Sequence, residues 1–376
     1  MAAFDNILID LTEAANRVGH HLVGAVPAVT INAGAERAAK GQSVVSYITG
    51  APQEQDINPS MTIPDGSEET LGQRSITLSN AKHVPIWWTG ESARRGSNYG
   101  FSDARVDQIY EAMNKLVRGA ETYLYQQIAS GSAYAAGVAG TTPFSTDVDE
   151  VVDVREALKA GGCPLNDDQL SLVLDSASSS ALMKLDKLQQ VNTSGDDMLL
   201  RVGSIGRLYN FTVRETLASL SQTSSGTSGA TTTAAASAGA TEVAVSAGGF
   251  VAGDVVSFAG HSTRYVVAEN LAAAGNLKLN GRLIADVASG AAITVEGDHA
   301  IAGVALHRSA AELAFRPPAI PDGGDAAIDR TLVTDAMSGL TFEVALYPGY
   351  QKNLVHVSCV YGAGVWKPEF ATILMG

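Results

Sequence analysis

The chain has 376 residues, of which 45% are hydrophobic and 17% are charged, and this balance is typical of a folded protein. The length predicts two or three domains, each large enough to bury a core. A formal net charge of -14 gives an acidic surface that repels phosphate backbones, so the composition argues against a general nucleic-acid-binding protein.

The cysteines and the N-terminus indicate a cytoplasmic origin. Cys163 and Cys359 are far apart and form no CxxC motif, so buried thiols are favoured over a disulfide. The first residues include Asp5 and Asp10 but no basic region, which argues against a signal peptide. No apolar run reaches the roughly 18 residues of a membrane helix. We expect a soluble protein made inside the cell.

The first hundred residues predict little regular structure after an opening amphipathic helix. Short strands are expected at Ser43–Ile48, Ser75–Leu78 and Pro85–Thr89. A long polar, turn-rich stretch separates the first two strands. Loops of this length usually contact a partner or carry function. A two-stranded arm that projects from the body fits the pattern best.

One helix dominates the middle of the chain. Apolar residues recur at helical spacing from Asp103 to about Ser130, which predicts a helix ~42 Å long that crosses the domain as a spine. Further elements follow it: a helix over Val151–Ala160, a buried strand over Leu170–Asp175, a helical segment, and a strand around Phe211.

The clearest boundary is Ser221–Ala240, where nearly every residue is Ser, Thr, Gly or Ala, a composition typical of a linker. Short strands follow over residues 241–297, with a tight hairpin predicted at Asn280-Gly281. They predict a small barrel or sandwich inserted into a larger domain. Mixed α/β character returns at Ile301, and Val360–Gly376 predicts a closing apolar strand docked in a sheet.

Motifs for catalysis are absent from the sequence. It has no HExxH, no GxSxG and no P-loop, and no further ligand at metal-binding spacing accompanies His20 and His21. We therefore predict no catalytic, cofactor-binding or metal-binding residue and no enzymatic activity. A hydrolase without a recognisable motif stays open as a minor alternative.

The best candidate contact residues are Trp87 and Trp88, followed by Arg94 and Arg95. Successive residues of a strand point to opposite faces, so at most one indole can enter the local core. Because Trp and Arg are enriched at interface hot spots, the other indole and the two arginines are candidates for an intersubunit contact. A structural role for both tryptophans stays open.

Three stretches carry a resemblance to a known family. They are VAGDVVSFAGHSTRYVV (Val251–Val267), HRSAAELAFRPPAIP (His307–Pro321) and VSCVYGAGVWKPEFATILMG (Val357–Gly376). Together with the order of the elements, they resemble major capsid (coat) proteins of tailed double-stranded-DNA bacteriophages, which have the Hong Kong ninety-seven type fold. The nearest likeness is to short-tailed Salmonella-phage-like coat proteins that carry an inserted β domain.

The resemblance implies an α+β phage major capsid fold and a division of the chain. The implied parts are an N-terminal arm (1–40), an extended two-stranded loop (41–98), a peripheral domain with the spine helix (99–160 and 331–376), an axial α/β domain (161–221 and 301–330) and an inserted all-β domain with its Ser/Thr/Gly/Ala linker (222–300). The closing strands Val357–Gly376 are expected beneath the spine helix, where they complete the peripheral sheet.

The resemblance also implies a function and partners. The chain would be a structural subunit that self-assembles into hexamers and pentamers of an icosahedral head, with a separate scaffolding protein and a portal. Packaged double-stranded DNA would be contacted only loosely, no membrane or cofactor would be bound, and the capsid would assemble in the host cytoplasm. Alternatives are an encapsulin-like compartment subunit and a surface adhesin or fibre module.

Overall fold

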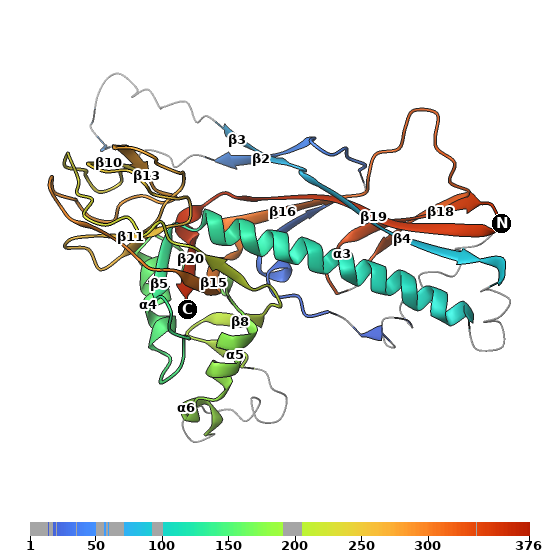
Figure 1. The fold of residues 1–376 in the computed structure, drawn as a ribbon, viewed down its shortest axis with the longest axis horizontal. Helices are drawn as coiled ribbons and strands as arrows, with labels where there is room; N and C mark the ends of the chain where they lie inside the picture. Colours follow the sequence, from blue (N-terminus) through green and yellow to red (C-terminus); the bar gives the residue numbers. More distant parts are fainter. Residues whose placement is uncertain are drawn as a thin grey trace.

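The computed structural model describes residues 14, 18, 19, 21–34, 36–49, 56, 57, 59, 71–91, 101–190, 205–335 and 337–376, with the backbone alone for 48, 49, 71 and 101–104. These residues form two large β-sheets, a long helix and a smaller β unit, so the predicted α+β class is confirmed. Figure 1 shows an elongated molecule in which helix α3 runs along much of its length. Among these residues, no helix is both long and apolar enough to cross a membrane.

Helix α3 (Phe101–Gly131) confirms the predicted spine within two residues at its start and one at its end. Ile109, Met113, Leu116 and Leu124 lie on its buried face. The shorter helices and single turns are α4 (Asp149–Ala160), α5 (Ser176–Met183), α6 (Asp186–Gln189), η1 (Val26–Ala28), η2 (Arg308–Ala310) and η3 (Pro368–Phe370).

The six-stranded sheet beside α3, here called the long sheet, is mostly antiparallel. Its strand order is β1 (Thr30–Ala33), β16 (Ala311–Arg316), β19 (Lys352–Val365), β18 (Thr341–Gly349) and β17 (Asp329–Thr334), with β4 (Asn80–Thr89) also paired to β19. Val355, Val357 and Cys359 of β19 are buried in one core with α3. Alternate residues of the same strands form the opposite face, where Ala38 is buried in one cluster with Val360.

The predicted two-stranded loop is present as the hairpin of β2 (Ser43–Thr49) and β3 (Leu71–Thr77), which pair only with each other among the described strands. Ile76 near the hairpin base is buried in one small cluster with Val360 of the long sheet. Gly362 permits this close approach, because a Cβ there would lie 2.3 Å from the Thr77 carbonyl oxygen.

The second sheet, here called the body sheet, has ten strands. Its order is β14 (Ile293–Val295), β11 (Val255–Phe258), β12 (Arg264–Val266), β5 (Tyr134–Gly137), β20 (Ala371–Met375), β15 (His299–His307), β6 (Leu170–Leu174), β8 (Phe211–Glu215) and β7 (Arg207–Leu208), with β9 (Leu220–Gln222) also paired to β15. Figure 1 shows this sheet gathered at one end of α3.

Residues 223–298 form the smaller β unit, which supplies β11, β12 and β14 to the body sheet and meets the rest of that sheet where β12 pairs with β5. Most of its buried apolar residues lie in one cluster. Strands β10 (Glu242–Val245) and β13 (Gly275–Lys278) form a separate pair within this unit. The predicted linker within Ser221–Ala240 is wrong. Thr232 and Ala236 donate backbone hydrogen bonds to Ala291 and Val287, so small side chains let this stretch lie against the unit as an integral part of it.

The predicted hairpin at Asn280-Gly281 is also wrong. β13 pairs with β10, and Asn280 instead donates from Nδ2 to the carbonyl oxygens of Ser130 (2.7 Å) and Ser132 (3.0 Å) at the C-terminal end of α3. A Cβ on Gly281 would lie 2.4 Å from the Cβ of Ala133. Asn280 therefore satisfies helix-end carbonyls, and Gly281 allows the β unit to dock there.

The closing strands divide between the two sheets, which corrects the expectation that Val357–Gly376 completes one sheet. β19 belongs to the long sheet, whereas β20 lies between β5 and β15 in the body sheet. The turn η3 begins at Pro368, which cannot donate to a strand ladder, so the chain changes sheets there. Helix α4 packs on β5 and β20, so 149–160 also lie with the body sheet rather than with the long sheet.

Buried carboxylates attach the N-terminal segment to the rest of the molecule. Glu121 of α3 is 2% exposed. It accepts hydrogen bonds from the backbone N–H groups of Gly24 (2.8 Å), Ala25 (2.7 Å) and Val26 (2.9 Å), and from Thr216 Oγ1 (2.9 Å). One side chain thus joins the helix, the turn η1 and the end of β8.

Glu312 of β16 is a second buried carboxylate, and it joins the hairpin to the long sheet. It accepts from Asn32 Nδ2 (2.8 Å), from Ser46 Oγ (2.9 and 3.0 Å) and from Trp366 Nε1 (2.8 Å). Glu343 of β18 is 4% exposed and binds Arg37. The segment between η1 and β2 is therefore held by side chains of the long sheet.

We expect Glu121→Gln to lower the free energy of unfolding by about 3 kcal/mol, because the amide group would turn N–H donors toward buried N–H groups. Urea denaturation followed by circular dichroism measures this change. The control is Glu111→Gln on the same helix, whose carboxylate is 57% exposed and 3.5 Å from His21 Nε2. Equal effects of the two substitutions would contradict the assigned role of Glu121.

Candidate interaction surface

The predicted tryptophan pair lies near the end of β4, and its two indoles occupy opposite faces of the long sheet. Trp88 packs against the core shared with α3, and its Nε1 donates to Gln108 Oε1 at 2.6 Å. The Arg105 guanidinium lies 5.1 Å from the Trp88 ring. Trp87 is 62% exposed, with Lys352 Nζ 5.5 Å from its ring. The expectation that at most one indole enters the local core is confirmed.

Two hollows flank this pair. The larger, about 730 Å³, is lined by Trp88, Thr89, Gly90, Glu91, Arg105, Gly349, Tyr350, Gln351, Lys352 and Asn353. The second, about 440 Å³, lies between β4 and α3 and includes both tryptophans, Gln108 and Lys115 in its lining. We call Trp87, Trp88, Arg105, Tyr350 and Lys352 the tryptophan surface. It combines exposed aromatic rings with two cations.

The turn between β18 and β19 completes the tryptophan surface. Tyr350 is 88% exposed, and Gln351 has a φ of 54°, a left-handed conformation that fixes the turn. Burial lowers the pKa of Arg105, although the guanidinium stays charged at neutral pH. Sequence reasoning missed Arg105, Tyr350 and Lys352, because they come from α3, from the turn between β18 and β19 and from β19. Arg94 and Arg95 lie outside the described residues.

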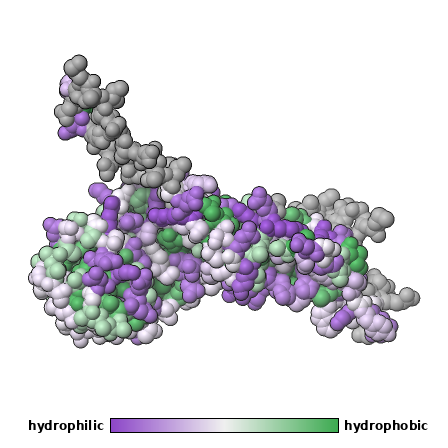
Figure 2. Space-filling view, turned by 90° about the horizontal axis from the view of Figure 1, so that it is seen from above, coloured by the Kyte–Doolittle hydropathy of each residue, from purple (hydrophilic) through white to green (hydrophobic). Residues whose placement is uncertain are grey.

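A second exposed apolar feature is the hairpin. Val45 is 48% exposed and Tyr47 is 69% exposed, although both lie on a paired strand. Figure 2 shows a surface on which hydrophilic residues predominate and hydrophobic ones form small patches. Residues 50–70, which connect β2 to β3, contain Glu54, Asp56, Asp65, Glu68 and Glu69 but no Lys or Arg. The sequence of this connection is therefore strongly acidic.

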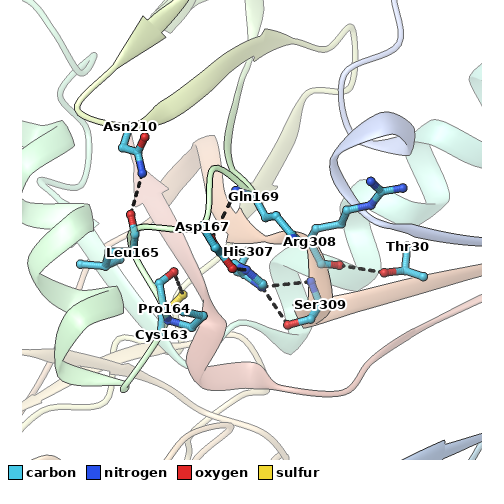
Figure 3. Close-up of polar contacts among 10 residues, drawn as sticks. All are labelled: Thr30, Cys163, Pro164, Leu165, Asp167, Gln169, Asn210, His307, Arg308 and Ser309. Carbon is cyan, nitrogen blue, oxygen red and sulfur yellow. Dashed lines mark hydrogen bonds and ion pairs between the residues drawn. The ribbon is translucent and has the colours of Figure 1, made fainter.

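A polar cluster at the end of β15 has the residue types of a catalytic triad. His307 Nε2 lies 2.7 Å from Asp167 Oδ2, and His307 Nδ1 lies 2.8 Å from Ser309 Oγ (Figure 3). No sequence motif could reveal it, because Asp167 lies in a loop far along the chain from His307. Such a chain of contacts can activate a serine when the histidine faces a substrate.

The geometry favours a structural role for this cluster. His307 is only 5% exposed, and its Nδ1 also accepts from the backbone N–H of Ser309 at 3.2 Å, which caps the turn η2. Nearby Cys163 is not an activated thiol, since burial, reinforced by the charge of Asp167, raises its pKa to about 12. The cluster ties the loop before β6 to the end of β15.

The described residues contain no group of three or more His, Cys, Asp or Glu that could hold a metal ion. No family model matches the chain, and no curated protein matches it.

Three of the solved structures to which the chain is similar are two phage capsids and a virus-like particle. A chain in the capsid structure of the cyanophage P-SCSP1u has 11% identity and a TM-score of 0.49, over 93% of this chain and 86% of that one. A chain of the bacteriophage PhiM1 mature capsid has 12% identity and a TM-score of 0.46, over 95% and 88%. A virus-like particle from Pyrococcus furiosus gives 11% identity and a TM-score of 0.45, over the full length of both chains.

The hydrogen bond from His307 is the main cause that lowers the pKa of Asp167 below its usual value of 3.8. A carboxylate with a lowered folded pKa stabilises the protein above its unfolded pKa, and this contribution is lost as pH falls through the folded value. We expect Asp167→Asn to lower the urea midpoint of unfolding at about pH 6. At about pH 3 the same substitution should lower this midpoint by a smaller amount.

The control for this experiment is Asp168→Asn, which changes the neighbouring residue. Asp168 forms an exposed ion pair with Arg207 at 3.0 Å, and such pairs contribute little. A destabilisation by Asp167→Asn that is the same at both pH values would contradict the assigned hydrogen bond between His307 and Asp167.

Proposed function

We propose that the chain is a major capsid protein, a structural subunit of the icosahedral head that encloses phage double-stranded DNA. The observation that most supports this proposal is the hairpin of β2 and β3. It pairs with no other described strand and leaves Tyr47 69% exposed. Exposed apolar side chains on an isolated hairpin are a liability in a monomer. They become useful when a neighbouring subunit covers them.

The rest of the subunit suits a shell wall. Helix α3 and the long sheet share one core, so this part of the molecule is a stiff, extended plate. The body sheet also contributes Val304 and Ile373 to this core, while the smaller β unit and the side of the body sheet that faces α4 have further clusters. Rigid parts joined by short connections can turn against one another while intersubunit contacts change, as in shell expansion. Hexamers and pentamers of this subunit would make the head.

Charge complementarity suggests which surfaces meet. The acidic connection 50–70 of one subunit would lie over the tryptophan surface of a second copy, where Arg105 and Lys352 supply positive charge and Trp87 supplies exposed aromatic area. Arg94 and Arg95 would contribute to the same contact. The N-terminal arm, peripheral, axial and inserted parts would follow the family's arrangement, with the boundary changes described above.

The same proposal assigns the remaining partners. A separate scaffolding protein and a portal would direct closure of the head, in the host cytoplasm. The acidic subunit would confine the packaged DNA while contacting it only loosely, because a net charge of -14 opposes extensive phosphate binding. The subunit would act without enzymatic activity.

The test is electron microscopy of the full chain and of the double variant Trp87→Ser, Lys352→Glu. We expect closed shells from the wild type. The variant should stay a soluble subunit whose free energy of unfolding changes by less than about 1 kcal/mol, because both side chains are largely outside the core. Sedimentation measures the loss of assembly, and a urea melt measures stability.

The matched control is Lys187→Glu on α6, an exposed lysine away from the tryptophan surface, which should still give shells. Normal shells from the double variant would exclude the tryptophan surface as an essential contact. A wild-type chain that forms only a discrete trimer would contradict the capsid function itself and favour a fibre module. Shells that enclose a protein cargo and no DNA in the native host would favour a compartment subunit.

A further inference from the structure

The edge strand β17 of the long sheet is open to another strand. It covers six residues and, among the described strands, pairs only with β18. Leu332 on this strand is 36% exposed, and Ile328 directly before the strand is 65% exposed. The strand contains no Pro and no Lys, the residues that commonly prevent an edge from pairing with another chain. β17 is therefore a regular edge strand with an exposed apolar side chain.

The other edges of the two large sheets are short or interrupted. β14, β9 and β7 of the body sheet have three, three and two residues, and β1 of the long sheet has four. β4 is longer, but Pro85 lacks an N–H donor and the strand contacts α3. Natural sheets are protected from edge pairing by features of this kind. Their absence from β17 indicates an edge that is used for contact.

The hydrogen bonds to β18 determine which backbone groups of β17 point outward. Just beyond the strand, the N–H of Asp335 donates to the Leu340 carbonyl at 2.9 Å. Bonded residues alternate along an antiparallel pair, so the odd-numbered residues of β17 bond to β18. The backbone groups of Arg330 and Leu332 therefore point away from the sheet. In agreement, the Arg330 N–H donates to the Asp329 carboxylate at 2.8 Å, a local acceptor that a strand carbonyl can replace.

We propose that β17 pairs in antiparallel fashion with β17 of a second copy of the chain, about a two-fold axis at Thr331. This axis places Arg330 opposite Leu332 of the partner subunit, and each such pair can exchange two backbone hydrogen bonds. Leu332 would pack on the aliphatic part of the arginine opposite it. The charge of Arg330 is already compensated in its own subunit by ion pairs with Asp325 and Glu343.

Charge favours this register over the two adjacent ones. An axis at Arg330 would place two guanidinium groups directly opposite each other. An axis at Leu332 would place Asp329 opposite Asp335 of the partner subunit. Like charges at opposite positions destabilise a strand pair. The axis at Thr331 avoids both arrangements.

This inference deepens the proposed function, because it names a contact between subunits, and it rests on that function for the place of the contact in a shell. Two-fold axes relate neighbouring subunits in an icosahedral shell, and a strand that pairs with its own copy fits such an axis. The contact is separate from the tryptophan surface, since β4 and β17 lie on opposite sides of β19 in the long sheet.

The test is disulfide cross-linking of the full chain with the substitution Thr331→Cys. At the proposed axis, the two copies of residue 331 form a non-hydrogen-bonded pair with Cα atoms roughly 4.5 Å apart, a separation that a disulfide spans. The matched control is Thr334→Cys on the same strand, whose two copies would lie about 20 Å apart. The natural Cys163 and Cys359 are both buried. Diamide is the oxidant, and electrophoresis without reductant measures the product.

We expect Thr331→Cys to give a covalent dimer and Thr334→Cys to stay monomeric. A lack of dimer from Thr331→Cys, or equal amounts of dimer from both variants, would overturn the proposed pairing.

A second substitution tests the contact without relying on the new thiol alone. Adding Leu332→Lys to Thr331→Cys should abolish the covalent dimer, because lysine on an edge strand opposes pairing. The control is the addition of Leu217→Lys, which changes a leucine that is 44% exposed outside β17 and should leave the dimer unchanged. Urea melts should show that both double variants stay folded. An equal yield of dimer with either lysine would overturn the pairing.

Electron microscopy of the same proteins separates this inference from the proposed function. Wild-type shells in which Thr331→Cys gives no dimer would overturn the pairing of β17 and leave the capsid function standing. A cross-linked dimer from a chain that forms no shell would support the pairing and contradict the capsid function.

Discussion

The buried carboxylate of Glu121 is the constraint on which the arrangement of the chain depends. A carboxylate inside a core is unfavourable unless every lone pair accepts a hydrogen bond, and here three consecutive backbone N–H groups and one hydroxyl do so. This requirement fixes the turn η1 against α3. Gly24 is needed at the same place, because a Cβ there would lie 2.4 Å from the Glu215 carbonyl oxygen. From η1 the chain enters β1 and then the hairpin, so the direction in which the hairpin leaves the subunit is set at Glu121 and maintained at Glu312.

Local periodicity correctly predicted the helices and strands whose buried residues recur at regular spacing. It failed where a segment packs against residues that are distant in the sequence. The stripe of α3, the helix α4 and the fully buried β6 were all recognisable from spacing. The stretch 221–240 looked like a linker because its side chains are small, yet its backbone groups are satisfied by residues some fifty positions later. Asn280-Gly281 carried a hairpin pattern, but tertiary contact with the end of α3 decided its conformation.

The tryptophan surface was predicted only in part, because some of its residues come from segments that are distant in the sequence. Alternation along β4 correctly separated Trp87 from Trp88, since it depends on the strand alone. The cations beside them come from α3 and β19, and only the pairing of β4 with β19 brings Lys352 under Trp87. The exposed hairpin and this surface are two places where the described residues leave apolar area exposed. Their opposite charges make contact between copies of the chain a physically consistent use for both.

The most direct measurement is an electron cryomicroscopy map of particles assembled from the full chain, at a resolution that shows side chains. The proposed assembly predicts a closed icosahedral shell in which residues 50–70 of one subunit cover Trp87 and Lys352 of its neighbour. A discrete, non-icosahedral oligomer, or a shell in which the tryptophan surface faces solvent, would contradict it.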